Sequence, residues 1–237
     1  MMKKLILALF ATFAIFAANA QSPIGAWESF ETLESGQKIR MVVIFTEDYQ
    51  VLTTFDAETG AFIDTNGGSW SLDGDVMTEV AAFNSDSSTA VGKKSSFKII
   101  LTDAILEIPK FALKFTRIDD GKPGELQGAW LMSGRIVDGK EQKRDITGPQ
   151  KTMKILSGKR FQWIAYHTET KEFLGTGGGT YTTENGRYTE NIEFFSKDNT
   201  KVGLKLGFDY LLENAVWKHS GFSSKGAPIN EIWVLRK

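Results

Sequence analysis

An internal repeat covers nearly all of the chain after its first 20 residues, and it constrains the fold more than any other feature. Residues 67–101 align without a gap to residues 178–212 at an offset of 111, and 12 of these 35 positions are identical. Average residue usage would give about two identities. The identical pairs are Gly67/Gly178, Gly68/Gly179, Thr78/Thr189, Glu79/Glu190, Phe83/Phe194, Ser85/Ser196, Thr89/Thr200, Val91/Val202, Gly92/Gly203, Lys94/Lys205, Phe97/Phe208 and Leu101/Leu212. A duplication of this extent predicts two similar domains in tandem.

The two copies also begin and end on similar residues. Each opens on Gly-Ala-Trp, with its tryptophan at Trp27 or Trp130, and closes on an arginine, Arg117 or Arg236. A guanidinium stacked on an indole gains about 0.5–2 kcal/mol. We therefore interpret these four residues as structural pairs that close the two domains. The alternative is an arginine that binds the carboxylate of a ligand.

The repeat also sets the predicted domain boundaries. Residues 21–119 form the first domain and residues 125–237 form the second, and a polar, turn-rich segment joins them. Upstream of Asp56 we align the copies at an offset of 112, because a one-residue insertion at a hairpin tip costs little. The pairs made in this way include Met41/Met153, Gln50/Gln162, Val51/Trp163 and Phe55/His167. We expect functional differences between the copies at Trp163 and His167.

Strand-like alternation dominates both copies. From Val202 to Leu212 every second residue is apolar, which is typical of a strand with one buried face. No segment of ten or more residues after the first 20 shows helical periodicity, and short strands separated by turns are typical of a barrel or sandwich. A barrel also removes the exposed edges of a sheet. The sequence therefore predicts an all-β fold with two antiparallel β-barrels in tandem.

The residues that open and close each copy resemble those of the lipocalin-like, or calycin, β-barrels. In that family a Gly-x-Trp lies at the start of the first strand, and an arginine near the last strand packs across the tryptophan. The stretch from Gly177 to Phe195 is also similar to domains of exported Bacteroidota proteins of unknown function. The resemblance implies two lipocalin-like barrels and, because most of the family binds small apolar molecules, a ligand in a barrel lumen. The helix and the disulfide that are common in lipocalins have no counterpart in this sequence.

The first 20 residues have the features of a signal peptide. Lys3 and Lys4 precede an apolar run over residues 5–17, and small residues precede a cleavage site after Ala20. We therefore expect an exported protein, either periplasmic or secreted. No second long apolar run follows, so we expect no membrane span in the mature chain. The chain has no cysteine, which excludes disulfides, cysteine nucleophiles and cysteine metal ligands.

Several classes of function lack support in the sequence. A net charge of -1 and a pI near 6.2 provide no basic surface for nucleic acid. Two histidines without cysteine do not predict a zinc site. The glycine-rich run 175–180 lacks the Lys-Ser/Thr ending of a phosphate-binding loop. We expect no metal, no cofactor and no nucleic-acid partner, and a protein partner stays open.

Alternation places a set of second-copy side chains in the lumen of the predicted barrel. They are Phe161, Trp163, His167, Tyr188, Glu190, Ile192, Phe194, Leu206, Phe208 and Tyr210. We predict that the aromatic rings supply contact area for a small, largely apolar ligand, and that Glu190 and His167 orient it. His167 can also be a partly exposed residue at a strand end.

The repeat places Glu79 of the first copy at the position of Glu190. Both lie between apolar neighbours, so each needs a partner or must give up its charge. A salt bridge to the closing arginine and a polar anchor for a ligand both remain open.

Non-catalytic ligand binding is the leading interpretation of the sequence, and two alternatives remain. In the first, side chains fill both barrels, and the outer surface binds a protein or a glycan. A cavity below about 300 Å³ would favour that alternative. In the second, Glu190 and His167 act as acid and base in an enzyme, although no nucleophile, metal or cofactor motif supports catalysis.

Overall fold

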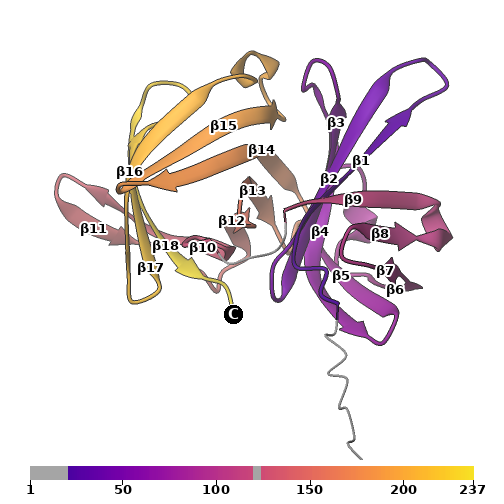
Figure 1. The fold of residues 1–237 in the computed structure, drawn as a ribbon. Coiled ribbons are helices and arrows are strands. Elements are labelled where there is room, and N and C mark those ends of the chain that lie inside the picture. Colours follow the sequence, from indigo (N-terminus) through magenta and orange to yellow (C-terminus); the bar gives the residue numbers. More distant parts are fainter. Residues whose placement is uncertain (1–20, 120–123) are drawn as a thin grey trace, which may run out of the picture.

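The computed structural model describes residues 21–119 and 124–237 and confirms an all-β chain with two antiparallel barrels (Figure 1). The predicted signal peptide, with its cleavage site after Ala20, lies outside the described residues, as does most of the predicted joint between the domains. No helix of the described part is long and apolar enough to cross a bilayer. Its helical elements are three 3-10 turns, η1 (Ser88–Ala90), η2 (Pro109–Phe111) and η3 (Asn199–Lys201).

The first barrel is a nearly closed meander. Its strands are β1 (Gly25–Thr32), β2 (Lys38–Phe45), β3 (Tyr49–Asp56), β4 (Phe62–Asp73), β5 (Val76–Asn84), β6 (Lys94–Lys98), β7 (Ile100–Leu101), β8 (Ile105–Ile108) and β9 (Leu113–Asp119). The sheet runs from β6 through β1 to β9, β8 and β7. Because only Ile99 separates β6 from β7, the chain itself connects the two edges of this sheet.

The second barrel repeats this order and closes. Its strands are β10 (Gly128–Val137), β11 (Lys140–Lys143), β12 (Gln150–Leu156), β13 (Arg160–His167), β14 (Phe173–Glu184), β15 (Arg187–Phe195), β16 (Lys205–Glu213), β17 (Val216–Phe222) and β18 (Pro228–Leu235). Pairing of β10 with β18 completes the ring. The β10–β11 hairpin projects from the barrel and accounts for the longer opening of the second copy (Figure 1).

The strand register shows that one offset, 111, relates the copies from β2 to β8 of the first barrel. Val51 lies opposite Gly67, and Gln162 lies opposite Gly178. Val51 and Gln162 are therefore equivalent at an offset of 111, and the predicted insertion near Asp56 is wrong. The pairs in this region are Val51/Gln162, Leu52/Trp163, Phe55/Tyr166 and Asp56/His167. Side chains alternate between the two faces of a strand. The offset of 112 therefore paired residues that lie on opposite faces of the barrel wall.

A β-bulge corrects a second sequence-based assignment. On β15, Ile192 pairs with Gly179 but Phe194 pairs with Gly178, so Glu193 is an extra residue in the ladder. The bulge reverses the alternation, since an extra residue shifts every later side chain to the other face. Phe194 therefore points out of the barrel, and Phe195 takes its place on the lumen side. The first copy has the same bulge opposite Gly67 and Gly68.

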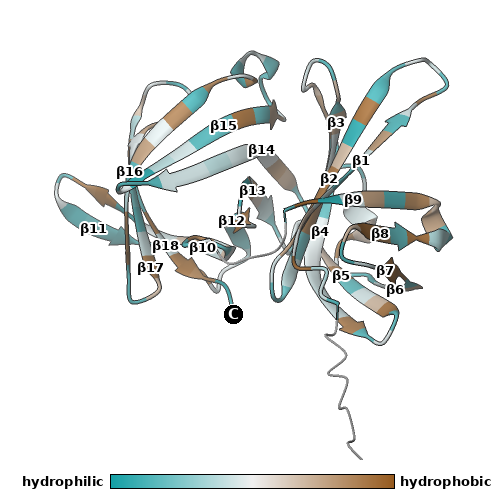
Figure 2. Ribbon diagram, in the orientation of Figure 1, coloured by the Kyte–Doolittle hydropathy of each residue, from teal (hydrophilic) through white to brown (hydrophobic). Residues whose placement is uncertain are grey.

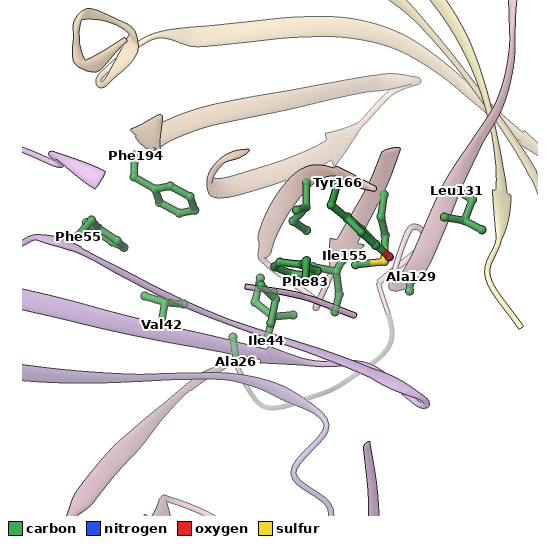
Figure 3. Close-up of a cluster of buried hydrophobic side chains, with 13 residues drawn as sticks. Ala26, Val42, Ile44, Phe55, Phe83, Ala129, Leu131, Ile155, Tyr166 and Phe194 are labelled. Atoms are coloured by element: carbon green, nitrogen blue, oxygen red, sulfur yellow. The ribbon is translucent and has the colours of Figure 1, made fainter. Parts of the chain in front are cut away.

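Buried side chains form three cores. One fills the first barrel around Trp27 and Phe115, and a second fills the second barrel around Trp217 and Tyr188. The third lies between the barrels. Its members are Ala26, Val42, Ile44, Val51, Phe55, Phe83, Ala129, Leu131, Met153, Ile155, Ile164, Tyr166 and Phe194 (Figure 3). On β2 the residues from Met41 to Phe45 are apolar and buried on both faces of the strand, whereas hydropathy colouring alternates along strands such as β15 (Figure 2).

The core between the barrels has local two-fold symmetry. Phe55 stacks on Phe194 with ring centroids 5.1 Å apart, and Phe83 packs on Tyr166 at 5.0 Å (Figure 3). Phe55 is equivalent to Tyr166 and Phe83 to Phe194, so the second contact repeats the first with the copies exchanged. Such a self-complementary arrangement is typical of a two-fold dimer interface.

The buried Gln162 side chain inside this contact has hydrogen-bond partners for both its amide nitrogen and its oxygen. The buried amide of Gln162 donates to Thr65 at 3.0 Å and to Thr176 at 2.9 Å, and its oxygen accepts from Thr53 at 2.6 Å. At the edge of the contact, Glu193 accepts from Arg40 at 2.9 Å. A buried polar group without partners costs about 1–3 kcal/mol, so this network removes a penalty from the shared core.

The two arginines proposed to close the barrels have different positions. The Arg117 guanidinium lies 3.9 Å from the Trp27 ring centroid and donates to the carbonyls of Ser22 and Ile24. For Arg236 the predicted contact with Trp130 is wrong: its guanidinium lies 4.1 Å from the Tyr49 ring of the first barrel. It also donates to the Tyr166 hydroxyl at 2.6 Å, so Arg236 joins the barrels.

The register explains the difference between the arginines. Trp27 pairs with Arg117 and Trp130 pairs with Leu235, so Leu235 and not Arg236 is the equivalent of Arg117. Neighbouring residues of a strand point to opposite faces, which turns Arg236 outward.

Candidate binding site in the second barrel

A buried ion pair lies in the lumen of the second barrel. Lys154 on β12 and Glu190 on β15 meet with Nζ and Oε1 2.8 Å apart, and each side chain is 6% exposed. Strand alternation turns Lys154 inward, while its neighbours Met153 and Ile155 join the core between the barrels. The Glu190 carboxylate thus has the salt bridge that the sequence allowed, with Lys154 in place of the closing arginine. Burial of two charges is tolerated because each satisfies the other.

Aromatic rings surround the Lys154 ammonium. Nζ lies 5.0 Å from the ring centroids of Tyr188 and Trp217, 5.2 Å from that of Trp233 and 5.8 Å from that of Phe208. An ammonium within about 6 Å of a ring centroid is attracted by the negative face of the ring. These four rings, here called the aromatic cage, and the Glu190 carboxylate together hold the Lys154 ammonium inside the barrel.

A histidine lies beside the cage. His219 on β17 is fully buried, with its ring centroid 4.1 Å from that of Phe208. Its Nδ1 lies 3.5 Å from Glu231 Oε2. Burial, and next the Lys154 ammonium, lower the pKa of His219 below its ordinary value, so the ring is neutral at pH 7.

Several polar atoms of this lumen have no hydrogen-bond partner among the described residues. They are the indole nitrogens of Trp217 and Trp233 and the Nε2 of His219. Buried polar atoms are almost always paired, so a group of them in one lumen indicates a place for a polar atom from outside the chain.

A cavity of about 220 Å³ adjoins these groups and extends to the β17–β18 hairpin at Ser223 and Ser224. Its lining combines aromatic and aliphatic residues with charged ones. The residues are Thr152, Lys154, Trp163, Glu190, Ile192, Phe195, Leu206, Phe208, His219, Ser223, Ser224, Ile229, Glu231 and Trp233. The cavity is smaller than the ~300–1,000 Å³ of typical small-molecule sites, so any occupant is compact.

The structure brings most of the ten predicted lumen residues together. Phe161, Tyr188, Ile192 and Phe208 are buried in the core of the second barrel, where Trp163, Leu206 and Tyr210 pack against them. Of the ten, five line the cavity: Trp163, Glu190, Ile192, Leu206 and Phe208.

Two of the ten lie elsewhere. The bulge carries Phe194 to the core between the barrels. His167 ends β13, where its Nδ1 accepts from the Thr170 amide at 3.1 Å, and it does not line the cavity. The acid–base pair of His167 with Glu190 therefore has no structural basis.

Sequence reasoning missed Lys154, His219, Glu231 and Trp233. The sequence holds a signal for His219, Glu231 and Trp233. His219 lies two residues after Trp217, and Trp233 lies two residues after Glu231. This spacing places the two members of each pair on one face of a strand. Lys154 gives no such signal, because a lysine in an apolar strand looks like an exposed residue until the barrel closes.

The described residues contain no group of three or more histidine, aspartate or glutamate side chains arranged to hold a metal ion. The arrangement instead offers hydrogen bonds, one fixed ion pair and aromatic contact area. These groups are compatible with a site that binds a small molecule.

Comparison with known proteins does not assign a family. A scan against models of protein families found no match, and a search of curated proteins found none.

Proposed function

We propose that the protein is an exported, non-catalytic binding protein that holds a compact ligand in its second, lipocalin-like barrel. The observation that carries the proposal is the group of unpaired polar atoms beside the cavity, above all the Trp233 indole nitrogen and His219 Nε2. A protein that merely filled this barrel would be more stable with apolar side chains at these positions.

The lining indicates the chemistry of the ligand. Trp163, Phe195 and Phe208 offer flat apolar contact area, and Trp233 and the Lys154 ammonium offer donors. A ligand with one ring or a short chain and a hydrogen-bond acceptor satisfies both. At about 220 Å³ the cavity is too small for the retinoids and sterols that larger lipocalin-type lumens hold.

Intrinsic tryptophan fluorescence tests the proposal directly. The probes are phenol, indole, benzoate and hexanoate, titrated into the mature protein, and native mass spectrometry of protein from its own source reports any resident molecule. We expect saturable binding of at least one probe that is lost in Ile229→Trp, which fills the cavity. The matched control is Leu211→Trp at an exposed strand position. Unchanged binding in Ile229→Trp, or no binding of any probe and no resident molecule, contradicts the proposal.

Cavity size favours a second candidate, in which the barrels are scaffolds and the outer surface binds a protein or a glycan. Side chains occupy most of both lumens, and the cavities of about 220 and 250 Å³ lie below the range of typical ligand sites. A glycan array and crosslinking in periplasmic extract distinguish this candidate, because its binding would be insensitive to Ile229→Trp.

A further inference from the structure

The first barrel has a cavity of about 250 Å³ at the same place as the cavity of the second barrel. Strand register makes most of the two linings equivalent. The pairs, first barrel before second, are Val43/Lys154, Leu52/Trp163, Glu79/Glu190, Ser95/Leu206, Phe97/Phe208, Ile108/His219, Leu113/Glu231 and Phe115/Trp233. The first barrel thus keeps the glutamate and replaces the lysine, the histidine and the second glutamate by aliphatic residues.

This replacement leaves Glu79 without a cation. Val43 stands where the second barrel has Lys154, and the Glu79 carboxylate makes no hydrogen bond or ion pair with any described residue. Burial raises the pKa of Glu79 to about 7. Lys93 lines an adjoining cavity of about 190 Å³ together with Glu79 but forms no ion pair with it.

The second barrel shows what satisfies a glutamate at this position. There an ammonium group, that of Lys154, lies 2.8 Å from the carboxylate and within 6 Å of four rings. The first barrel retains rings at two of these four positions, Phe97 and Phe115. It therefore has the acid and part of the aromatic cage but lacks the cation between them.

We propose that the first barrel binds a small organic ammonium ion, with its charged group on Glu79 and its apolar body against Phe97 and Phe115. The Lys154 side chain takes up the corresponding space in the second barrel, so this specificity belongs to the first barrel alone.

The remaining lining is consistent with a cationic ligand. Glu79 is the one charged residue among the described side chains that line this cavity, and Gln50, Asn66 and Ser95 add neutral polar groups. An anion would meet the carboxylate with no compensating charge. Phe111 on η2 lines the cavity and is half exposed, so the site can be reached from solvent at this end of the barrel.

Calorimetric titration of the mature protein at pH 8 with 2-phenylethylammonium tests the proposal. The matched probes are 2-phenylethanol and 3-phenylpropionate, which keep the ring and change the charge. We expect the ammonium probe to bind at least tenfold more tightly than either. We expect Glu79→Gln to weaken it at least tenfold, while Glu58→Gln, at an exposed glutamate, leaves it unchanged. Equal affinity for the three probes, or full affinity in Glu79→Gln, overturns the proposal.

The pH dependence gives an independent readout that needs no variant. The carboxyl must be ionised to pair with the probe, which itself stays protonated over this range. With a pKa near 7 for Glu79, affinity falls by roughly thirtyfold from pH 8 to pH 5.5. Affinity that does not change with pH contradicts the site. The second barrel takes no part in this binding. A negative result for Glu79 therefore does not bear on the proposed function of the second barrel, and the Ile229→Trp result does not bear on the ammonium site.

Discussion

Phe62 and Phe173 are equivalent residues of the two copies, and they stack on each other with ring centroids 6.1 Å apart and an interplanar angle of 10°. A residue can touch its own equivalent only where it lies on the axis that relates the copies. The contact between the barrels is therefore built like the interface of a homodimer whose two subunits are joined in one chain. Gly60 in the adjoining hairpin permits the close approach, because a Cβ there would lie 2.3 Å from the Glu193 carbonyl oxygen.

A first prediction concerns a single copy expressed alone. Residues 125–237 without the first barrel would expose the face around Tyr166 and Phe194, which the intact chain buries. Because an apolar face of this kind is covered in soluble proteins, we expect the fragment to self-associate or aggregate. Size-exclusion chromatography with light scattering measures this. A stable monomer would contradict a shared core.

The stacked pair across the contact should contribute strongly to stability. We expect Phe194→Ala to lower the free energy of unfolding by about 3–5 kcal/mol, because it removes a buried ring and leaves a cavity. The matched control is Phe222→Ala, at a phenylalanine that is 65% exposed, for which the change should stay within about 0.5 kcal/mol. Urea unfolding followed by fluorescence gives both values. Similar values for the two variants would be inconsistent with the packing.

The buried ion pair should show strong coupling. Lys154→Met leaves the Glu190 carboxylate buried without its cation, which costs about 3–5 kcal/mol. The double variant Lys154→Met with Glu190→Leu removes both charges, and we expect it to recover most of the loss. A double-mutant cycle from urea unfolding measures the coupling. Additive effects of the two single changes would show that the side chains do not interact.

Stability should depend on pH through Glu79. In the unfolded chain this carboxyl titrates near its ordinary value of 4.5, and in the folded protein near 7. Between these values the folded state binds more protons, so stability falls as pH rises from about 4.5 to about 7 and is level above.

Removal of the titrating group tests this linkage. We expect that the free energy of unfolding of Glu79→Gln does not show this fall between pH 4.5 and pH 7. At pH 8 we expect it to exceed that of the wild type by about 1–3 kcal/mol. Urea unfolding at pH 4.5, 6 and 8 measures the difference. Parallel profiles for variant and wild type would show that Glu79 is not the group responsible.

Local patterns in the sequence were sufficient for the barrels and for much of the lumen. Phe161, Tyr188 and Phe208 follow a strict alternation, and each lies inside the second barrel as predicted. The same reasoning failed at Phe194, because a bulge of one residue is not visible in the alternation and reverses the face of everything after it.

The sequence by itself determined that the chain is a duplication, that each copy is an antiparallel barrel, and that Glu79 and Glu190 occupy equivalent positions between apolar neighbours. These properties depend on repeats and on period-two alternation, which are local. Only the tertiary structure decided that Lys154 neutralises Glu190, that Arg236 joins the barrels, and that each copy covers the outer apolar face of the other. Those partners come together through ring closure and through the two-fold contact, and the distances that fix them exist only once distant strands have paired.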